Sequence, residues 1–196
     1  MSPIDPISGA LFLMTAFLIA GIAQVAWFAS SLAKSRALSA PLDGGLMLRG
    51  RRLFGENKTF RGFVVMVPAA AIAFPFVAFE MTQHAPAAAG LWPLTPLGYA
   101  ALGAWAGLGF MLGELPNSFL KRQLDIPPGA ARANRLAWTV QLLADRLDSG
   151  IGMLTAVSVA VPTPWLTWII VLTTGPALHW LFSVVMFQLG TKARPA

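Results

Sequence analysis

The sequence predicts an all-α protein that crosses a membrane five times. Of its 196 residues, 56% are hydrophobic and only 11% are charged, whereas a soluble domain usually has about 25% charged residues. The mean hydropathy is +0.66. This composition excludes a soluble enzyme and a disordered chain, because too few polar side chains are present to cover a water-exposed surface. At roughly 20 residues per crossing, we expect residues 1–196 to form one membrane domain.

Five apolar runs give the positions of the expected helices. They are residues 9–32, 62–81, 97–115, 151–161 and 165–189. The fourth run is short, but a helical pattern at 136–148 precedes it and extends it to the membrane boundary. Pro162 and Pro164 mark a turn before the fifth run. Residues 33–61 form the first predicted loop, and residues 116–148 form the second predicted loop and the start of the fourth helix.

The basic residues predict the orientation. All 14 lysines and arginines fall within 33–61, within 116–148 or in the tail after residue 190. Short loops rich in Lys and Arg face the cytoplasm. We therefore expect a multi-pass protein of the cell (inner) membrane with its N-terminus outside and both loops and the C-terminus in the cytoplasm. Trp92, Trp165 and Trp168 lie near the predicted outer boundaries, as residues of an aromatic belt do.

Two glycine pairs lie in the third apolar run. Gly103 and Gly107 are four residues apart, and so are Gly109 and Gly113. Small residues at this spacing let two helix backbones approach closely. The pattern favours packing within the chain, and it also allows a homodimer.

The first loop has a composition that suits phosphate groups. Residues 41–62 contain five glycines interleaved with five cations. Glycine lets backbone N–H groups close around an anion, and arginine provides forked donors that match phosphate oxygens. The alternative is a basic loop that sets topology and touches anionic lipids. The glycines and the acidic Asp43 and Glu56 speak against it, because a topology signal needs neither.

The second loop contains a pair of carboxylates at its far end. Asp145 and Asp148 are three residues apart, which places both on one face of a helix. Such a pair binds Mg²⁺ together with substrate phosphates and water. The alternative is a set of ion pairs with Arg146 or neighbouring cations. Cysteine is absent, and His84 and His179 show no ligand spacing, so we expect no thiolate or imidazole metal site.

Together, the two loops resemble those of the CDP-archaeol synthases. The resemblance lies in residues 41–45 and 50–62 of the first loop, and in 113–122 and 145–148 of the second. The larger CDP-diacylglycerol synthases have a Ser-x-x-Lys-Arg segment and a final Asp-Arg-x-Asp. The matching residues here are Ser118, Lys121, Arg122, Asp145, Arg146 and Asp148. The chain lacks the Lys-Asp and His-Gly-Gly segments of the larger family, and Glu114 stands where relatives often have Asp.

The resemblance implies a membrane cytidylyltransferase. Such an enzyme joins CTP to a phosphatidic-acid-type lipid of the cytoplasmic leaflet and releases pyrophosphate. It implies Mg²⁺ as cofactor, held by Asp145, Asp148 and Glu114, and no nucleic-acid partner. It implies catalytic roles for Asp145, Asp148, Lys121 and Arg122. The substrate-binding residues that it implies are Asp43, Arg51, Arg52, Lys58, Thr59, Arg61, Asn117 and Ser118.

Two other functions are compatible with parts of the pattern. A CDP-alcohol phosphotransferase has a D-G-x-x-A-R segment and later paired acids; Asp43 and Gly44 begin such a segment, but the Ala-Arg pair does not follow. A transporter or non-catalytic membrane scaffold needs polar residues along its spanning faces, and only a few scattered ones are present. The acids and cations gather instead at the predicted cytoplasmic boundary, which favours chemistry at that interface.

Overall fold

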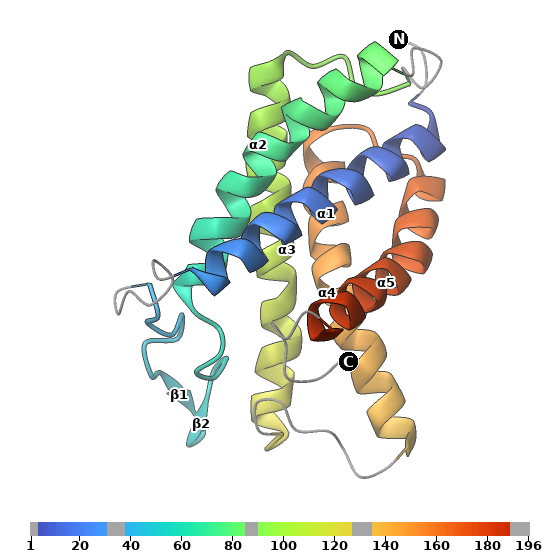
Figure 1. Ribbon diagram of the computed structural model, residues 1–196. Helices are drawn as coiled ribbons and strands as arrows, with labels where there is room; N and C mark the ends of the chain where they lie inside the picture. The colour runs from blue at the N-terminus through green and yellow to red at the C-terminus, as the bar shows by residue number, and fades with distance from the viewer. Residues whose placement is uncertain (1–3, 31–37, 85–89, 127–134, 189–196) are drawn as a thin grey trace.

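The computed structural model describes residues 4–30, 38–84, 90–126 and 135–188, and this part of the chain is a bundle of helices with one short hairpin (Figure 1). The helices are α1 (Pro6–Ala29), α2 (Phe60–His84), α3 (Pro96–Gln123), α4 (Arg135–Ala160) and α5 (Trp165–Gln188), and strand β1 (Met47–Leu48) pairs antiparallel with β2 (Arg51–Arg52). The predicted all-α class is confirmed. By length and hydropathy, α1 and α2 each suffice to cross a membrane.

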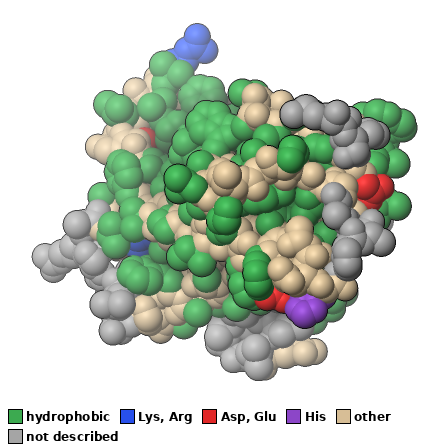
Figure 2. Space-filling view, turned by 90° about the horizontal axis from the view of Figure 1, so that it is seen from above, with side chains coloured by type: hydrophobic (Ala, Val, Ile, Leu, Met, Phe, Trp, Pro, Cys, Tyr) green, Lys and Arg blue, Asp and Glu red, His purple; other side chains and the backbone are tan. Residues whose placement is uncertain are grey.

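Five crossings and the orientation stay predictions. Several of the cations behind the orientation lie outside the described residues, namely Lys34, Arg36, Arg132, Lys192 and Arg194. The hairpin, the end of α3 and the start of α4 nevertheless lie at one end of the bundle (Figure 1). The opposite end, seen from above in Figure 2, shows mainly apolar side chains and backbone with few charged groups. This separation agrees with two basic loops on the same side.

Helix α3 is longer than predicted. The sequence predicts that the third helix ends near residue 115, where a polar stretch begins, but α3 continues through Pro116 to Gln123. A proline inside a helix removes one hydrogen bond and bends the helix, and neighbouring helices can hold such a bend in place. Here α3 packs against both α2 and α4. As a result, Asn117, Ser118, Lys121 and Arg122 lie on a helix and not in a loop.

The glycine pairs of α3 bring three helices into close contact. A Cβ added at Gly107 would lie 3.1 Å from the backbone oxygen of Met66 on α2. A Cβ added at Gly109 would lie 2.6 Å from the backbone oxygen of Gly152 on α4. Both pairs therefore serve packing within the chain, as the sequence favoured, and the possible homodimer gains no support from them.

An aromatic cluster of the core lies near the end of the bundle opposite the hairpin. The rings of Phe12 and Phe74 meet edge to face with centroids 5.0 Å apart, and Phe12 also contacts Trp92 and Tyr99. Trp92 is buried and donates from Nε1 to the backbone oxygen of Pro162 at 2.7 Å. The prediction that Trp92 belongs to an aromatic belt is therefore wrong, because its ring fills the core and does not face lipid.

Candidate functional site

The first loop folds around the carboxylate of Asp43. Its Oδ1 accepts hydrogen bonds from the backbone N–H of Gly45 at 3.1 Å and from Nη2 of Arg52 at 2.5 Å. Its Oδ2 accepts from the backbone N–H groups of Phe54 and Gly55 at 3.1 and 3.0 Å. Gly45 and Gly55 have φ values of 85° and 90°, which a side chain would strain. The glycines thus let the backbone wrap this buried anion.

The surroundings of Asp43 favour its ionised form. Burial alone would raise the pKa of Asp43, but the Arg52 guanidinium and three backbone N–H groups outweigh it and hold the pKa well below its ordinary range. Arg52 also contacts Glu56 at 3.1 Å. All of these partners belong to the loop itself, so the contacts indicate a structural role for Asp43 and Arg52. Their binding of substrate stays a prediction.

Two arginines connect the loop to the end of α3. Nη1 of Arg51 donates to the backbone oxygen of Gln123 at 2.7 Å, and Nη2 pairs with Asp125. The side chain of Arg122 lies against Gly55, where an added Cβ would come within 3.3 Å of the Arg122 Cδ. The loop is therefore held over the last turns of α3. Arg51 fastens it there, and its predicted contact with substrate also stays a prediction.

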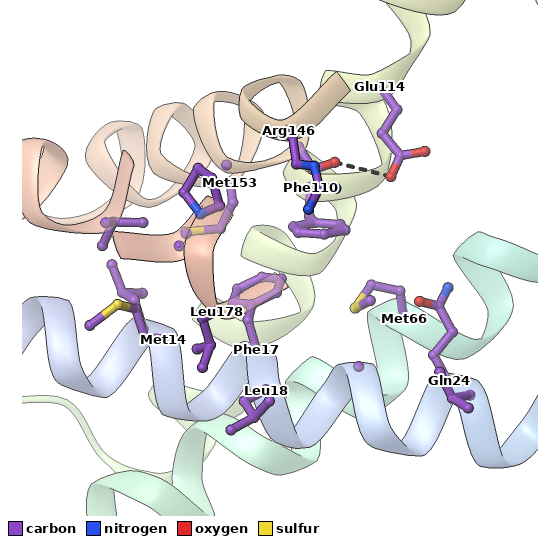
Figure 3. Close-up of a pocket in the computed structure, with 18 of the residues that line it drawn as sticks. Met14, Phe17, Leu18, Gln24, Met66, Phe110, Glu114, Arg146, Met153 and Leu178 are labelled. Carbon is purple, nitrogen blue, oxygen red and sulfur yellow. Dashed lines mark hydrogen bonds between the residues drawn. The ribbon is translucent and has the colours of Figure 1, made fainter. Parts of the chain in front are cut away.

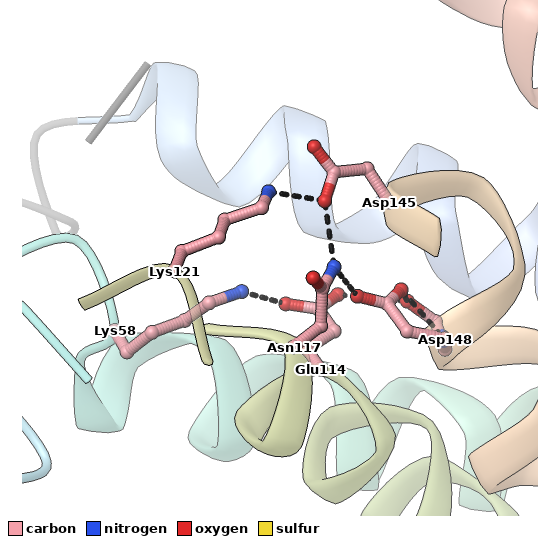
Figure 4. A network of polar contacts seen from close by, with 7 residues as sticks. Lys58, Glu114, Asn117, Lys121, Asp145 and Asp148 are labelled. Atoms are coloured by element: carbon pink, nitrogen blue, oxygen red, sulfur yellow. Dashed lines mark hydrogen bonds and ion pairs between the residues drawn. The ribbon is translucent and has the colours of Figure 1, made fainter. Parts of the chain in front are cut away.

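Asn117 links the two aspartates of α4. Its Nδ2 donates to Oδ1 of Asp145 at 2.6 Å and to Oδ2 of Asp148 at 2.8 Å. Nζ of Lys121 pairs with the same Oδ1 of Asp145 (Figure 4). Asn117 and Lys121 are four residues apart on α3, and Asp145 and Asp148 are three apart on α4, so each pair shares a face of its helix. The predicted carboxylate pair is thus in place, held by residues of the neighbouring helix.

Glu114 connects the loop to both helices. Its Oε2 pairs with Nζ of Lys58, which lies just before α2, and its Oε1 accepts from Oγ of Ser149 at 3.0 Å. The Ser149 hydroxyl is also 3.2 Å from Oδ1 of Asp148. Figure 4 shows Lys58 and Lys121 reaching the carboxylates from the same side. Three parts of the chain that are distant in sequence meet at this point.

These side chains surround a cavity of about 280 Å³, here called the polar cavity. Its lining includes eight of the predicted site residues, which come from the first loop, α3 and α4. They are Lys58, Glu114, Asn117, Ser118, Lys121, Arg122, Asp145 and Asp148. Within the described part of the chain, the buried Nε of Arg122 has no hydrogen-bond partner. The sequence analysis therefore predicted most of this lining, and the cavity offers cations and carboxylates to one ligand.

Two further cavities adjoin the polar cavity. One, of about 420 Å³, has Thr59 and Arg61 in its lining and is here called the arginine cavity. The other, of about 670 Å³, lies between α1, α3, α4 and α5 and is lined mainly by apolar side chains; it is here called the apolar cavity (Figure 3). Glu114 lines all three cavities, and Asp145 lines both the polar and the apolar cavity. A polar compartment therefore meets an apolar one at these carboxylates.

The comparison with known families agrees with the geometry. The family model described as CarS-like, CDP-archaeol synthase, matches residues 10–195. The chain belongs to the CDP-archaeol synthase family. The family predicted from the two loops is thereby confirmed, and with it the class of a membrane cytidylyltransferase of lipid biosynthesis.

Individual members of the CDP-archaeol synthase family cover most of the chain. The CDP-archaeol synthase of Halobacterium salinarum is 36% identical over 163 residues, which cover 79% of this chain and 82% of that protein. The CDP-archaeol synthase of Pyrococcus abyssi is 30% identical over 177 residues, which cover 87% and 92%. A solved structure described as an intramembrane enzyme for archaeal membrane lipid biosynthesis matches with a TM-score of 0.61 and 24% identity, covering 89% of this chain and 92% of that one. This likeness shows a shared fold.

The carboxylates fit a divalent cation in their chemistry. Oxygen ligands about 2.0–2.1 Å from the ion are typical of Mg²⁺. Asp145 and Asp148 both approach one point, which Nδ2 of Asn117 occupies at 2.6 and 2.8 Å. Among the described residues, no three acidic or imidazole groups gather at such a point, and Glu114 pairs with Lys58. The structure thus joins two of the three predicted ligands, and the role of Glu114 as a ligand stays a prediction.

Three residues of the site were missed by the sequence analysis. Ser149 contacts Glu114 and Asp148, and its position four residues after Asp145 on a helix is the signal that identifies it. Asn57 lines both the polar and the arginine cavity. Gln24 lines the arginine and apolar cavities. Nothing in the local sequence around Gln24 indicates this position, because it depends on how α1 packs.

Proposed function

We propose that this member of the CDP-archaeol synthase family transfers the cytidylyl group of CTP to a phosphatidic-acid-type lipid, giving a CDP-lipid and pyrophosphate. The single observation that carries the proposal is the meeting of the polar and apolar cavities at Glu114 and Asp145. A substrate with a phosphate group and long apolar chains needs both compartments at once. The names of the curated relatives support the same class of reaction.

The reaction requires positioning and charge neutralisation. An oxygen of the lipid phosphate forms a bond to the α-phosphorus of CTP, and the bond from that phosphorus to the bridging oxygen of the β-phosphate breaks, with the electron pair leaving on pyrophosphate. The attacking oxygen is already anionic near neutral pH, so no general base is needed. Lys58, Lys121 and Arg122 line the cavity where these charges would meet. Fixed cations of this kind supply most of the catalysis in phosphoryl-transfer chemistry.

A divalent cation completes the proposed charge balance. Asp145 and Asp148 would hold Mg²⁺, with Asn117 beside them. Bound there, the ion would neutralise phosphate charge and orient the phosphate oxygens. The chain's own part is to place the two carboxylates on one helix face, and to keep Lys121 within reach of Asp145.

The apolar cavity supports a lipid substrate that enters from the membrane. Its walls include Leu13, Phe17, Met153 and Leu172, and Glu114, Asp145 and Arg146 line its polar part. We propose that the phosphate of the lipid reaches these polar residues while its chains lie among the apolar ones. If the predicted orientation holds, the site faces the cytoplasm and draws lipid from the cytoplasmic leaflet of the inner membrane.

One assay tests the proposal against its alternatives. Purified protein in detergent is incubated with labelled CTP, Mg²⁺ and phosphatidic acid, and both pyrophosphate and labelled lipid are measured. Equal amounts of both products, formed only when lipid phosphate is present, support the proposal. Turnover that instead requires a CDP-lipid and an alcohol indicates a phosphotransferase. No turnover with either substrate pair would contradict both enzymes and favour a scaffold or transporter.

A further inference from the structure

Gln24 has a position that the proposed reaction does not yet use. It lies on α1 and lines both the arginine cavity and the apolar cavity. In the described lining of these two cavities, it is the one side chain from α1 that carries nitrogen or oxygen. Figure 3 shows its amide directed into the space between the helices, with Glu114 on the opposite wall. Among the described residues, this amide has no hydrogen-bond partner.

Gln24 is half-buried, and most of its neighbours on α1 are apolar. The rest of the α1 wall consists of apolar side chains such as Phe17, Leu18 and Phe28. Placing an unpaired amide among apolar groups is unfavourable unless a ligand or water completes its hydrogen bonds. A glutamine amide offers two N–H donors and one carbonyl acceptor. A ligand group that binds the Gln24 amide should therefore be polar and should be attached to an apolar part of the ligand.

The shape of a lipid phosphate supplies such a group. Its phosphate is followed by glycerol, whose two linkage oxygens come before the apolar chains. If the phosphate lies with the cations and the chains lie in the apolar cavity, the linkages must lie where the compartments meet. Gln24, Phe28 and Glu114 line both the arginine and the apolar cavity, and Glu114 is already engaged with Lys58 and Ser149. Of the described residues at that junction, Gln24 is thus the polar one without a hydrogen-bond partner in the chain.

We infer that Gln24 binds the glycerol linkages of the lipid substrate and helps to determine lipid specificity. The inference rests on the proposed function and deepens it. An ester linkage presents a carbonyl oxygen as well as an alkoxy oxygen, whereas an ether presents only the alkoxy oxygen. The N–H donors of Gln24 therefore gain more from an ester-linked lipid than from an ether-linked one. Gln24 does not contact the reacting phosphorus, so its effect is on lipid binding and not on the chemical step.

The test replaces Gln24 by a side chain of similar length without the amide. The Gln24→Met variant is compared with Thr15→Val, which also removes polarity from α1 but at an exposed position outside the described cavity linings. The KM values for CTP, for a diacylglycerol phosphate and for a dialkylglycerol phosphate are measured for wild type and both variants. We expect Gln24→Met to raise the KM for the diacyl lipid about 3–10-fold, as loss of one hydrogen bond does. The rise should be smaller for the dialkyl lipid, and the KM for CTP should not change.

The outcomes separate this inference from the proposed function. An unchanged lipid KM in Gln24→Met, an equal rise for both lipids, or an equal rise for CTP would overturn the role of Gln24 while leaving the cytidylyltransferase intact. The same rise in Thr15→Val would also overturn it, because the effect would then belong to α1 in general. If wild-type protein turns over CTP with neither lipid, the proposed function fails and this inference fails with it.

Discussion

The close approach of α3 and α4 sets the geometry of the polar cavity, and a substitution at Gly113 tests this. Gly113 comes immediately before Glu114 on α3 and faces the backbone of α4 at Asp148 and Gly152. A Cβ added at Gly113 would lie 2.9 Å from Cα of Gly152 and 3.1 Å from its nitrogen, and closer still to the backbone oxygen of Asp148. Ordinary contacts of a Cβ are 3.4–4 Å. The Gly113→Ala variant must therefore move the two helices apart by roughly 0.5–1 Å, on the contact distances that packed atoms keep.

Moving α3 away from α4 would stretch the hydrogen bonds that join the site residues of the two helices. Ser149 on α4 contacts Glu114 on α3 at 3.0 Å, and Asn117 contacts Asp148 at 2.8 Å. Overpacking of this kind costs about 1–3 kcal/mol of stability. A misplacement of about 1 Å in a site that works by positioning can cost about 100-fold in rate. We therefore expect kcat/KM of Gly113→Ala, measured by lipid-dependent pyrophosphate release, to fall about 100-fold while the protein still folds in detergent.

The matched control is Gly9→Ala. Gly9 is also buried in a helix, but an added Cβ there would lie 3.5 Å from Oγ1 of Thr167, an ordinary contact at the other end of the bundle. Its activity should stay close to wild type, and thermal unfolding of both variants gives the stability change. Near-native kcat/KM in Gly113→Ala would refute the reasoning, because the helix separation would then not control the site. Equal losses in both variants would assign the effect to general destabilisation.

Three further predictions test the charged groups of the site. Asp145→Asn and Asp148→Asn should each abolish Mg²⁺-supported turnover of CTP in folded protein, and near-native rates would remove them as metal ligands. Lys58→Ala should raise the KM for CTP more than Lys34→Ala, since Lys34 is assigned only to topology. Asp43→Asn should lower stability by about 1.5–3 kcal/mol at neutral pH. Because folding lowers the pKa of Asp43, this difference is present above its unfolded value and should shrink as the pH falls below about 3.9, as measured by thermal unfolding at several pH values.

Most helices could be predicted from the sequence because each long apolar run corresponds to one helix. The expected runs 62–81 and 165–189 correspond to α2 and α5 within a few residues. The end of α3 could not be predicted in the same way, because proline disfavours a helix locally while packing against α2 and α4 outweighs that preference. The β1–β2 hairpin was also not predicted. Two strands of two residues each give too short a pattern, and the hairpin depends on the buried carboxylate of Asp43.

The residues of the site could be predicted where their type and helical spacing determine their position. Four charged residues of the second loop line the polar cavity, because helical spacing places them on facing sides of α3 and α4: Lys121, Arg122, Asp145 and Asp148. The roles of Asp43, Arg51 and Arg52 were harder to predict, because an arginine that fastens a loop and one that binds phosphate look the same in a sequence. Only the partners of Arg51 and Arg52 in the fold distinguish the two roles. The position of Gln24 required the packing of α1.

The charges of the polar cavity bear on how two anions can meet there. Its described lining holds three cations, Lys58, Lys121 and Arg122, and three carboxylates, those of Glu114, Asp145 and Asp148. Two unit charges 4 Å apart interact by about 4 kcal/mol at an effective dielectric constant of 20. A lining without net charge gives a triphosphate and a lipid phosphate no overall attraction, and each lysine must first leave its carboxylate. A divalent cation held by Asp145 and Asp148, as proposed above, would add positive charge to this lining and would leave Lys121 free to bind phosphate. On that proposal, the Lys121–Asp145 pair would be the substrate-free form of the site, and Lys121 would exchange its carboxylate for phosphate when substrate binds.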